Sequence, residues 1–182
     1  MSTETLDIVY DIPDEKIVED RHILSVLVDD EFGVLNRVVG LFSARGYNIE
    51  SLTVAEVDRK KNWSRITVVT RGSASKIKHI IALLERMVPV HKVNDLTVEG
   101  PFVERELALV KVVGRGDDRV EALRLAEIFR AKPVDTTIES FVFEITGTSE
   151  KVDTFIKLMK PLGMVEVCRT GVASVSRGKK GI

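Results

Sequence analysis

The chain has 182 residues, of which 44% are hydrophobic, and its 27 Lys+Arg against 28 Asp+Glu give a formal net charge of −1. This near-neutral balance argues against a nucleic-acid-binding protein, which normally carries a basic excess, and no apolar run reaches the roughly 18–20 residues of a membrane-spanning helix. The acidic N-terminus lacks the basic start and apolar core of a secretory signal, and a single cysteine, Cys168, permits neither an internal disulfide nor a thiolate metal site. We therefore expect a globular, cytoplasmic protein of one large or two small domains.

Residues 1–21 are polar and acidic, with Pro13 near the middle. They show no sustained apolar period, so we expect a solvated arm with room for one short strand at Leu6–Tyr10. The periodic part of the chain begins at His22.

The first periodic segment, residues 22–98, alternates strands with amphipathic helices. Ile23–Val28 is a short apolar run rich in β-branched residues, which is typical of a buried strand. Apolar residues then recur at helical spacing from Val34 to Phe42 and stop before Gly46, where a glycine favours the end of a helix. Two strands joined by a polar hairpin loop, a second helix and a closing strand follow. These are Asn48–Val57, Ser64–Thr70, the helix marked by Ile77, Ile80, Ile81 and Leu84, and Val88–Val98.

The same order of elements returns in residues 102–178, after a break at Glu99–Pro101. Its elements are the strand Leu107–Val113, a helix marked by Ala122, Leu125, Ala126 and Phe129, the paired strands Pro133–Ile138 and Ser140–Thr146, a helix marked by Val152, Phe155, Ile156 and Met159, and the strand Met164–Arg169. A constant offset of 75 residues relates the second helices of the two segments and carries Gly72 onto Gly147. We interpret the pattern as a duplication.

The order strand–helix–strand–strand–helix–strand, twice over, predicts an α+β chain of two ferredoxin-like βαββαβ units in tandem. Each unit would be an antiparallel four-stranded sheet with two helices on one face, the first at 22–98 and the second at 102–178. A unit of about 75 residues buries only a modest core, and its uncovered sheet face and edge strand need a partner. That partner is either the sister unit or a second chain, so we expect self-association.

Few residues could carry catalysis. His22, His79 and His91 show neither an i, i+4 metal pair nor a Cys–His spacing, so we interpret them as surface or hydrogen-bonded imidazoles. Cys168 in an apolar strand is most simply a small core residue, and Gly114–Asp118 is a glycine turn with an aspartate helix cap. The sequence has no nucleophile elbow, Walker loop or dinucleotide-binding motif. We expect a protein that is not an enzyme and that needs no metal or cofactor of its own.

RNA-recognition modules share this order of elements and stack bases on exposed aromatic residues of their first and third strands. The first unit has no aromatic residue in the runs Ile23–Val28 and Ser64–Thr70. In the second unit Phe141 and Phe143 share one face of the third strand, but the neighbouring strand Leu107–Val113 offers no stacking partner. We therefore expect both phenylalanines to serve core or interface packing, and we expect no nucleic acid to bind.

The loop after the first strand, Asp29–Leu35, allows two interpretations. A tight turn from a buried strand into a helix leaves the first helical N–H groups without an intrahelical partner, which suits a carboxylate-sized anion. Gly33 has no Cβ and lets a ligand approach the backbone, while a nearby acidic or amide side chain could hold an ammonium group. The alternative is structural, with Asp30 as the helix N-cap and Gly33 as a turn residue, and spacing alone favours it.

The segment Gly33–Val54, GVLNRVVGLFSARGYNIESLTV, resembles the amino-terminal ACT domain of the small, regulatory subunit of acetolactate synthase. Further similar stretches follow along the chain, and the resemblance covers residues 22–178. They are SRITVVTRG (64–72), VERELALVKV (103–112), AEIFRAKPVD (126–135), EITGTSEKVDTFI (144–156) and CRTGVASVSRG (168–178).

The resemblance implies a non-catalytic subunit that binds and stimulates a thiamine-diphosphate-dependent catalytic subunit and carries feedback inhibition by valine or another branched-chain amino acid. In this family two amino-terminal domains pair side by side, with the effector between them. By that pattern the effector is held by residues from both chains of a homodimer. They are Asp30, Gly33, Val34 and Leu35 of one chain and Asn48 and Ile49 of the other. The family usually has Asn at the position of Asp30.

An alternative within the same resemblance is a stand-alone amino-acid-binding ACT protein that regulates another target, such as transcription. The sequence shows no DNA-reading helix-turn-helix, which counts against a transcriptional role.

Overall fold

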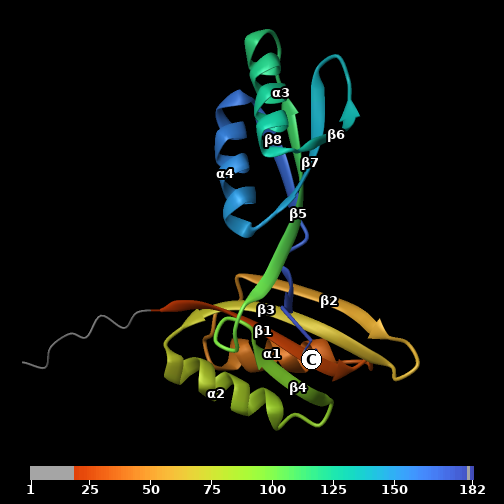
Figure 1. Cartoon of the computed structure of the whole chain (residues 1–182), viewed down its shortest axis with the longest axis vertical. Coiled ribbons are helices and arrows are strands. Elements are labelled where there is room, and N and C mark those ends of the chain that lie inside the picture. Colours follow the sequence, from red (N-terminus) through yellow and green to blue (C-terminus); the bar gives the residue numbers. More distant parts are fainter. Residues whose placement is uncertain (1–18, 180) are drawn as a thin grey trace, which may run out of the picture.

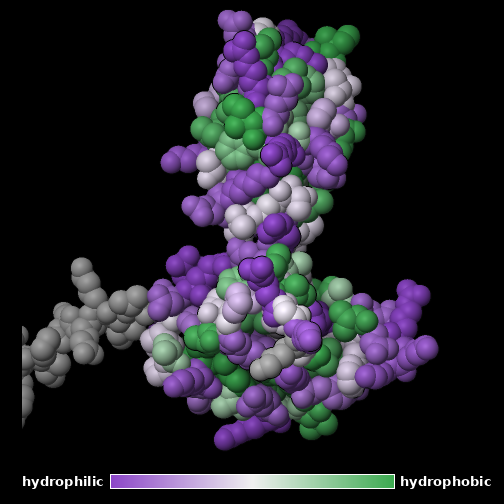
Figure 2. All heavy atoms as spheres, in the orientation of Figure 1, coloured by the Kyte–Doolittle hydropathy of each residue, from purple (hydrophilic) through white to green (hydrophobic). Residues whose placement is uncertain are grey.

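The chain forms two α+β domains stacked end to end (Figure 1). The computed structural model describes residues 19–179 and 181–182, so the strand expected at Leu6–Tyr10 lies outside the described residues. Each domain has the order strand–helix–strand–strand–helix–strand, which confirms the prediction of two ferredoxin-like βαββαβ units. Figure 2 shows that the two bodies meet at a narrow neck with hydrophilic side chains gathered around it.

The N-terminal domain is a four-stranded antiparallel sheet in the order β2-β3-β1-β4, with both helices on one face (Figure 1). Its elements are β1 (Asp20–Asp29), α1 (Val34–Ala44), β2 (Ser51–Asp58), β3 (Trp63–Gly72), α2 (Ala74–Glu85) and β4 (Val90–Asp95). Alternate residues of β1 face the helices, and Leu24, Val26 and Val28 share a buried cluster with Phe42 of α1. Burial stabilises the fold by about 1.5–3 kcal/mol for each such side chain. This core holds α1 against the sheet and so fixes the turn that leads into the helix.

The C-terminal domain repeats the architecture with the sheet order β6-β7-β5-β8. Its elements are β5 (Phe102–Val113), α3 (Asp117–Phe129), β6 (Lys132–Thr136), β7 (Ser140–Gly147), α4 (Ser149–Met159), a 3₁₀ turn at Lys160–Leu162, β8 (Met164–Arg169) and the short strand β9 (Ala173–Ser176). Phe141 and Phe143 are buried in the core, which confirms their assignment as packing residues. Phe143 meets Phe155 of α4 edge to face, with 6.3 Å between ring centroids.

Cys168 is exposed, so the prediction that it is a core residue is wrong. It lies opposite Leu109 in the β5–β8 ladder, and Leu109 is exposed as well. The neighbours of Leu109 on β5, Ala108 and Val110, point instead into the core under the helices. A sheet with helices on one face buries only alternate residues of each strand. The register of Cys168, rather than the apolar character of its strand, therefore decides its exposure.

Strand β9 was not expected from the sequence, and it connects the two domains. It pairs antiparallel with the first residues of β5, from Phe102 opposite Ser176 to Arg105 opposite Ala173. This ribbon packs on the helix-free face of the N-terminal sheet through a small apolar cluster. The cluster consists of Ile23, Val69, Leu96, Val172 and Phe102. Part of the sheet face that was expected to need a partner is therefore covered by the chain itself.

A cleft of about 850 Å³ lies at the neck between the domains and is lined by several ion pairs. Glu106 of β5 is 4% exposed and accepts two hydrogen bonds from Arg169, at 2.5 Å from Nε and 2.7 Å from Nη2. Arg169 also donates to Asp153 of α4 at 2.6 Å. The hydrogen bond to Glu106 raises the pKa of Arg169, although partial burial acts in the opposite direction. The guanidinium therefore stays charged and neutralises the buried carboxylate.

Gly171, between β8 and β9, lies in close contact with the edge strand β2. A Cβ at this position would lie 2.7 Å from Ser51 Oγ, and the backbone φ is +82°. The next residue, Val172, donates its N–H to Ser51 Oγ at 2.9 Å, and its carbonyl accepts from Thr53 Oγ1 at 3.0 Å. These bonds fasten the connection between the domains to the N-terminal sheet.

We expect Gly171→Ala to lower the free energy of unfolding by about 2–3 kcal/mol. A positive φ costs an alanine about 1–2 kcal/mol, and displacement of the Ser51 contact costs about 1 kcal/mol more. Urea unfolding followed by circular dichroism measures the loss. Gly46→Ala is the matched control, because Gly46 has a φ of +66° and no atom within 4 Å of a Cβ. Equal losses in the two variants would contradict the proposed contact.

Candidate functional site

The turn between β1 and α1 presents an uncapped helix N-terminus. Gly33 occupies the N-cap position in the left-handed conformation, with φ +83° and ψ −4°, and no side chain caps the helix. The first helical hydrogen bond runs from the N–H of Arg37 to the carbonyl of Gly33 at 3.0 Å. The amide hydrogens of the first turn therefore lack a side-chain acceptor, and together with the helix dipole they favour an anion. The interpretation of Asp30 as the N-cap is wrong, because the chain needs three more residues to reach the helix.

Neighbouring strands hold this turn in place. The N–H of Asp30 donates to the carbonyl of Asn62 at 2.7 Å, and Asn62 Nδ2 returns a bond of 2.8 Å to the carbonyl of Asp30. Asp29 Oδ1 lies 2.6 Å from His91 Nε2, and the ring of Trp63 packs on that imidazole at 4.8 Å. Only the backbone of Asp30 is used in these contacts, so its exposed side chain remains available to a ligand. A turn fixed by the β2–β3 hairpin and by β4 is preorganised for binding.

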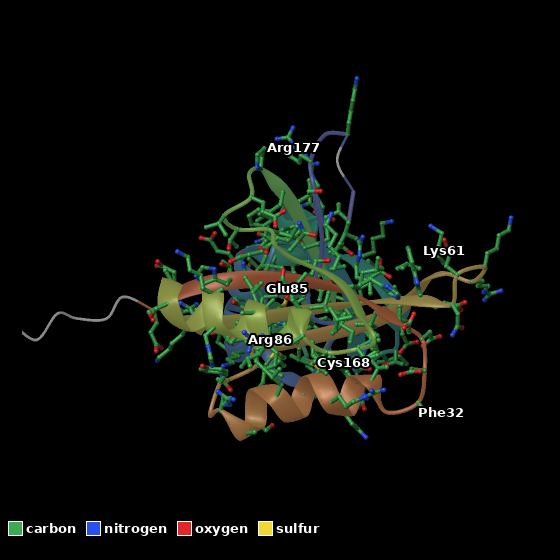
Figure 3. The ribbon with its side chains drawn as sticks, turned by 90° about the horizontal axis from the view of Figure 1, so that it is seen from below. Phe32, Lys61, Glu85, Arg86, Cys168 and Arg177 are labelled. Atoms are coloured by element: carbon green, nitrogen blue, oxygen red, sulfur yellow. The ribbon has the colours of Figure 1, made fainter. Side chains whose placement is uncertain are left out.

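The apolar residues of the turn differ in their exposure. Val34 is 3% exposed and belongs to the domain core, so it can offer a ligand only its backbone. Leu35 is 40% exposed and presents its side chain at the start of the helix. Phe32 is fully exposed and projects from the tip of the turn (Figure 3). Phe32 lies inside the loop Asp29–Leu35 but is not among the site residues that the resemblance implies, although an aromatic residue inside an acidic turn is a signal for a contact with another molecule.

Asn48 and Ile49 lie at the opposite end of α1. The helix has 11 residues and so extends about 16 Å at 1.5 Å per residue. Asn48 is exposed, and its carbonyl accepts a 2.6 Å bond from Thr70 Oγ1, while Ile49 packs against the domain core. Within one chain the structure therefore brings together Asp30, Gly33 and Leu35 but leaves Asn48 a full helix length away.

Strand β2, beside α1, is an open edge of the N-terminal sheet. Its side chains Val54 and Val57 are 45% and 50% exposed, and the structure describes no strand paired with its outer side. Because α1 connects β1 to β2 across β3, the helix lies on the same side of the domain as this edge. An unpaired strand with exposed valines is a surface on which a second strand can add.

Comparison with known proteins gives the family. Residues 24–92 match the family model of the AHAS small subunit-like ACT domain. Residues 105–178 match a second family model, described as the small subunit of acetolactate synthase. It is 47% identical to the acetolactate synthase small subunit of Haemophilus influenzae over 163 residues, which cover 89% of this chain and 99% of that protein. The chain belongs to the acetolactate synthase small-subunit family.

Other members of the small-subunit family support this result. The probable acetolactate synthase small subunit of Archaeoglobus fulgidus is 42% identical, with 88% of this chain and 99% of that protein covered. The crystal structure of the small subunit from Thermotoga maritima shares the fold with a TM-score of 0.80 and 36% identity, covering 88% of this chain and 99% of that chain. The similarity thus extends over both domains of this chain and over almost the whole length of these relatives.

The remaining polar candidates in this family member have structural partners. His22 is 8% exposed and lies 2.7 Å from Asp95 Oδ2, while His79 on α2 contacts Arg45 at 3.0 Å. Among residues 19–179 and 181–182, no group of three His, Cys, Asp or Glu side chains is placed to hold a metal ion. No helix in the described part of the chain is long and apolar enough to cross a membrane.

Proposed function

We propose that this chain is a regulatory, non-catalytic subunit that binds and stimulates the catalytic subunit of acetolactate synthase and makes it sensitive to feedback inhibition by valine. The proposal is supported by identities of 42–47% to small subunits over nearly their whole length. Those relatives are named as small subunits of this synthase, which implies a larger partner that holds the active site.

The observation that carries the effector site is the separation of its two halves along α1. The uncapped turn at Gly33 and the exposed Asn48 lie at opposite ends of an 11-residue helix. A second copy related by a twofold axis, with its α1 antiparallel to the first, would place Asn48 of each chain beside Gly33 of the other. The open edge of β2 lies beside α1 and supports the same pairing, since two such edges can form one continuous sheet. The proposed homodimer therefore has two equivalent effector sites.

Each site has groups for both ends of a free amino acid. The valine carboxylate would accept hydrogen bonds from the uncapped first turn of α1, where backbone N–H groups and the helix dipole favour negative charge. The carboxylate of Asp30 would accept a charge-assisted bond from the ammonium group. Leu35, 40% exposed, offers an apolar contact for the isopropyl group. Asn48 of the second chain would close the site with its amide.

Regulation follows if the ligand favours one arrangement of the dimer over another. Because residues of both chains contact the effector, binding stabilises the arrangement in which the turn and Asn48 are closest. The arrangement of the dimer in turn changes the surface offered to the catalytic subunit. Coupling free energies of this kind are typically about 1–3 kcal/mol, which corresponds to an effect of about 5–150-fold on affinity.

Reconstitution with the catalytic subunit tests this proposal. We expect acetolactate formation by the purified catalytic subunit to rise when the full-length chain is added and to fall again with millimolar valine. A catalytic subunit assayed alone is the control, and its activity should not respond to valine. Failure of the chain to bind or stimulate the catalytic subunit would instead favour a stand-alone amino-acid-binding regulator of another target.

A further inference from the structure

The helix-free face of the N-terminal sheet carries three polar residues on neighbouring strands. Ser25 of β1 lies directly opposite Asn94 of β4 in the antiparallel ladder. On its other side Ser25 faces Thr67 of β3, and Arg65 lies two residues further along that strand on the same face. Diagonal neighbours of this kind have Cβ atoms within about 7–8 Å, so a long arginine side chain reaches the space beside Ser25.

Each of the three residues has a buried polar atom without a hydrogen-bond partner among the described residues. These atoms are Ser25 Oγ, Arg65 Nε and Asn94 Oδ1. Ser25 as a whole is only 1% exposed. An unsatisfied buried polar group destabilises the fold, and native proteins contain few of them. Three such atoms on one patch of sheet indicate that another molecule completes their hydrogen bonds.

The three residues line a single pocket of about 360 Å³ between the sheet and the chain that follows β9. Leu96, Pro101 and Val175 supply an apolar wall on the same pocket. Figure 3 shows Arg177, another lining residue, on the side of the domain away from α1. The pocket therefore lies on the opposite side of the sheet from the turn at Gly33, and it is built entirely within one chain.

Charge on the pocket walls is divided between two groups. Arg65, Lys92 and Arg177 are cationic, and none of them makes an ion pair with a described residue. Lys92 Nζ donates only to the carbonyl of Gly181, at 3.4 Å. The acidic side chain in the lining, Glu99, accepts a hydrogen bond from Asn94 Nδ2, which leaves Asn94 Oδ1 as a free acceptor beside it. The terminal residue Ile182 also lines the pocket. One end of the pocket is thus suited to an anion and the other to a cationic donor.

We propose that this pocket is a second small-molecule site, which binds an aliphatic α-amino acid within each chain. The ligand carboxylate pairs with Arg65 and accepts from Ser25 Oγ. Its ammonium group donates to Asn94 Oδ1 and pairs with Glu99, and its side chain lies against Leu96 and Val175. Pockets that bind small molecules measure about 300–1,000 Å³, so the volume admits a ligand of this size. The site is independent of the dimer interface and goes beyond the proposed function.

Calorimetric titration of the full-length chain with L-alanine, L-valine and L-leucine tests the site. The Gly33→Asp variant serves as the background, because that change is aimed at the interface site and leaves the pocket untouched. We expect one binding event per chain to persist in this background and to tighten as the aliphatic side chain grows. Loss of all binding in Gly33→Asp would overturn the second site while leaving the interface site in place.

Substitutions in the pocket locate the binding event. Asn94→Leu and Arg65→Met should each weaken it at least about tenfold, and the milder Ser25→Ala about twofold to tenfold, with thermal melting as the check on folding. Arg59→Met is the matched control, because Arg59 is 90% exposed on the β2–β3 hairpin and lies outside the pocket. Unchanged affinity in a folded Ser25→Ala and Asn94→Leu pair would overturn the assignment.

Two further results decide the chemistry. L-2-hydroxyisovalerate, which lacks the ammonium group of valine, should bind at least about tenfold more weakly than L-valine, and equal binding would overturn the role of Asn94 and Glu99. A crystal of the chain soaked in L-leucine should show the amino acid across Ser25 and Asn94. Density for ordered water alone at those atoms would overturn the proposal.

Discussion

Gly33→Asp should raise the valine concentration for half-maximal inhibition at least about tenfold while leaving stimulation of the catalytic subunit intact. No atom lies within 4 Å of a Cβ at Gly33, so the new side chain has room, and the positive φ of +83° costs about 1–2 kcal/mol of stability. The added carboxylate lies beside the first turn of α1, where it would repel the carboxylate of the ligand. Loss of charge-assisted bonds worth about 1.5–3 kcal/mol corresponds to about tenfold or more in affinity.

The matched control for this variant is Gly116→Asp in the C-terminal domain. Gly116 is the N-cap of α3, has a positive φ of +59° and is likewise without a side-chain cap, so the prediction of an aspartate cap in Gly114–Asp118 is wrong. A Cβ there also meets no atom within 4 Å, so the added charge is matched, and the backbone strain is at least as large because the ψ of Gly116 is −130° against −4° at Gly33. Valine inhibition measured on the reconstituted synthase should be normal for Gly116→Asp. If Gly33→Asp left the inhibition curve unchanged, the site assignment would be rejected.

Mixed dimers show whether the site is shared between chains. Asn48→Ala should also weaken valine inhibition, since it removes the amide that the second chain contributes. A dimer of one Gly33→Asp chain and one Asn48→Ala chain would keep one site in which both residues are native. We expect such dimers, purified through two different affinity tags, to recover binding at half of the sites. No recovery would indicate that each site lies within a single chain.

Arg169→Leu should lower the free energy of unfolding by about 2–4 kcal/mol. The change leaves the carboxylate of Glu106, which is 4% exposed, without its two hydrogen bonds from the guanidinium. Removal of one partner of a buried pair costs about 3–5 kcal/mol, and the value is reduced here because the side chain of Arg169 is 35% exposed. Denaturant unfolding at pH 7 measures the loss.

A double variant identifies the cause of this loss. In Arg169→Leu the carboxylate of Glu106 stays buried without its cationic partner, and Glu106→Gln in the same background removes that buried charge. The double variant should therefore recover part of the lost free energy of unfolding. Arg115→Leu is the control, because its pair with Glu139 is exposed on both sides and should contribute less than about 1 kcal/mol. Equal losses in the single and the double variant would assign the effect to lost packing instead.

The sequence was sufficient for the repeated fold because the apolar periods are strong. The spacing of Val34, Val38 and Phe42 places α1 correctly, and all three are buried. Strand β9 is not predicted from the sequence, because its four residues, Ala173–Ser176, are too few to show the alternation of apolar and polar residues typical of a strand. Its formation depends on pairing with the start of β5, which is a contact over about 70 residues of chain. The burial of Cys168 is also predicted wrongly, because its exposure depends on the face of the sheet on which it lies, and the pairing of β8 with β5 decides that face.

The candidate sites also differ in whether their residues are adjacent in the chain or are brought together only by the fold. The glycine turn of Gly33 is visible in the sequence, because the turn and the helix that follows are adjacent in the chain. The position of Asn48 relative to that turn involves the length of α1 and a second copy of the chain. Ser25, Arg65 and Asn94 are far apart in sequence and become neighbours only through the strand register. No local pattern marks them, and the three unpartnered atoms appear only in three dimensions.

Strand β5 has a consequence for how the molecule can be divided. Its 12 residues pair with β9 over the first domain and with β7 and β8 within the second, so a single rod of backbone is shared by both halves. A chain truncated before Phe102 would lose the residues that cover Ile23, Val69 and Leu96. The isolated N-terminal domain would then expose a hydrophobic patch to solvent and tend to aggregate. Because β5 runs without a break through both domains, a change in the orientation of one domain also moves the other, as it would not if a flexible linker joined them.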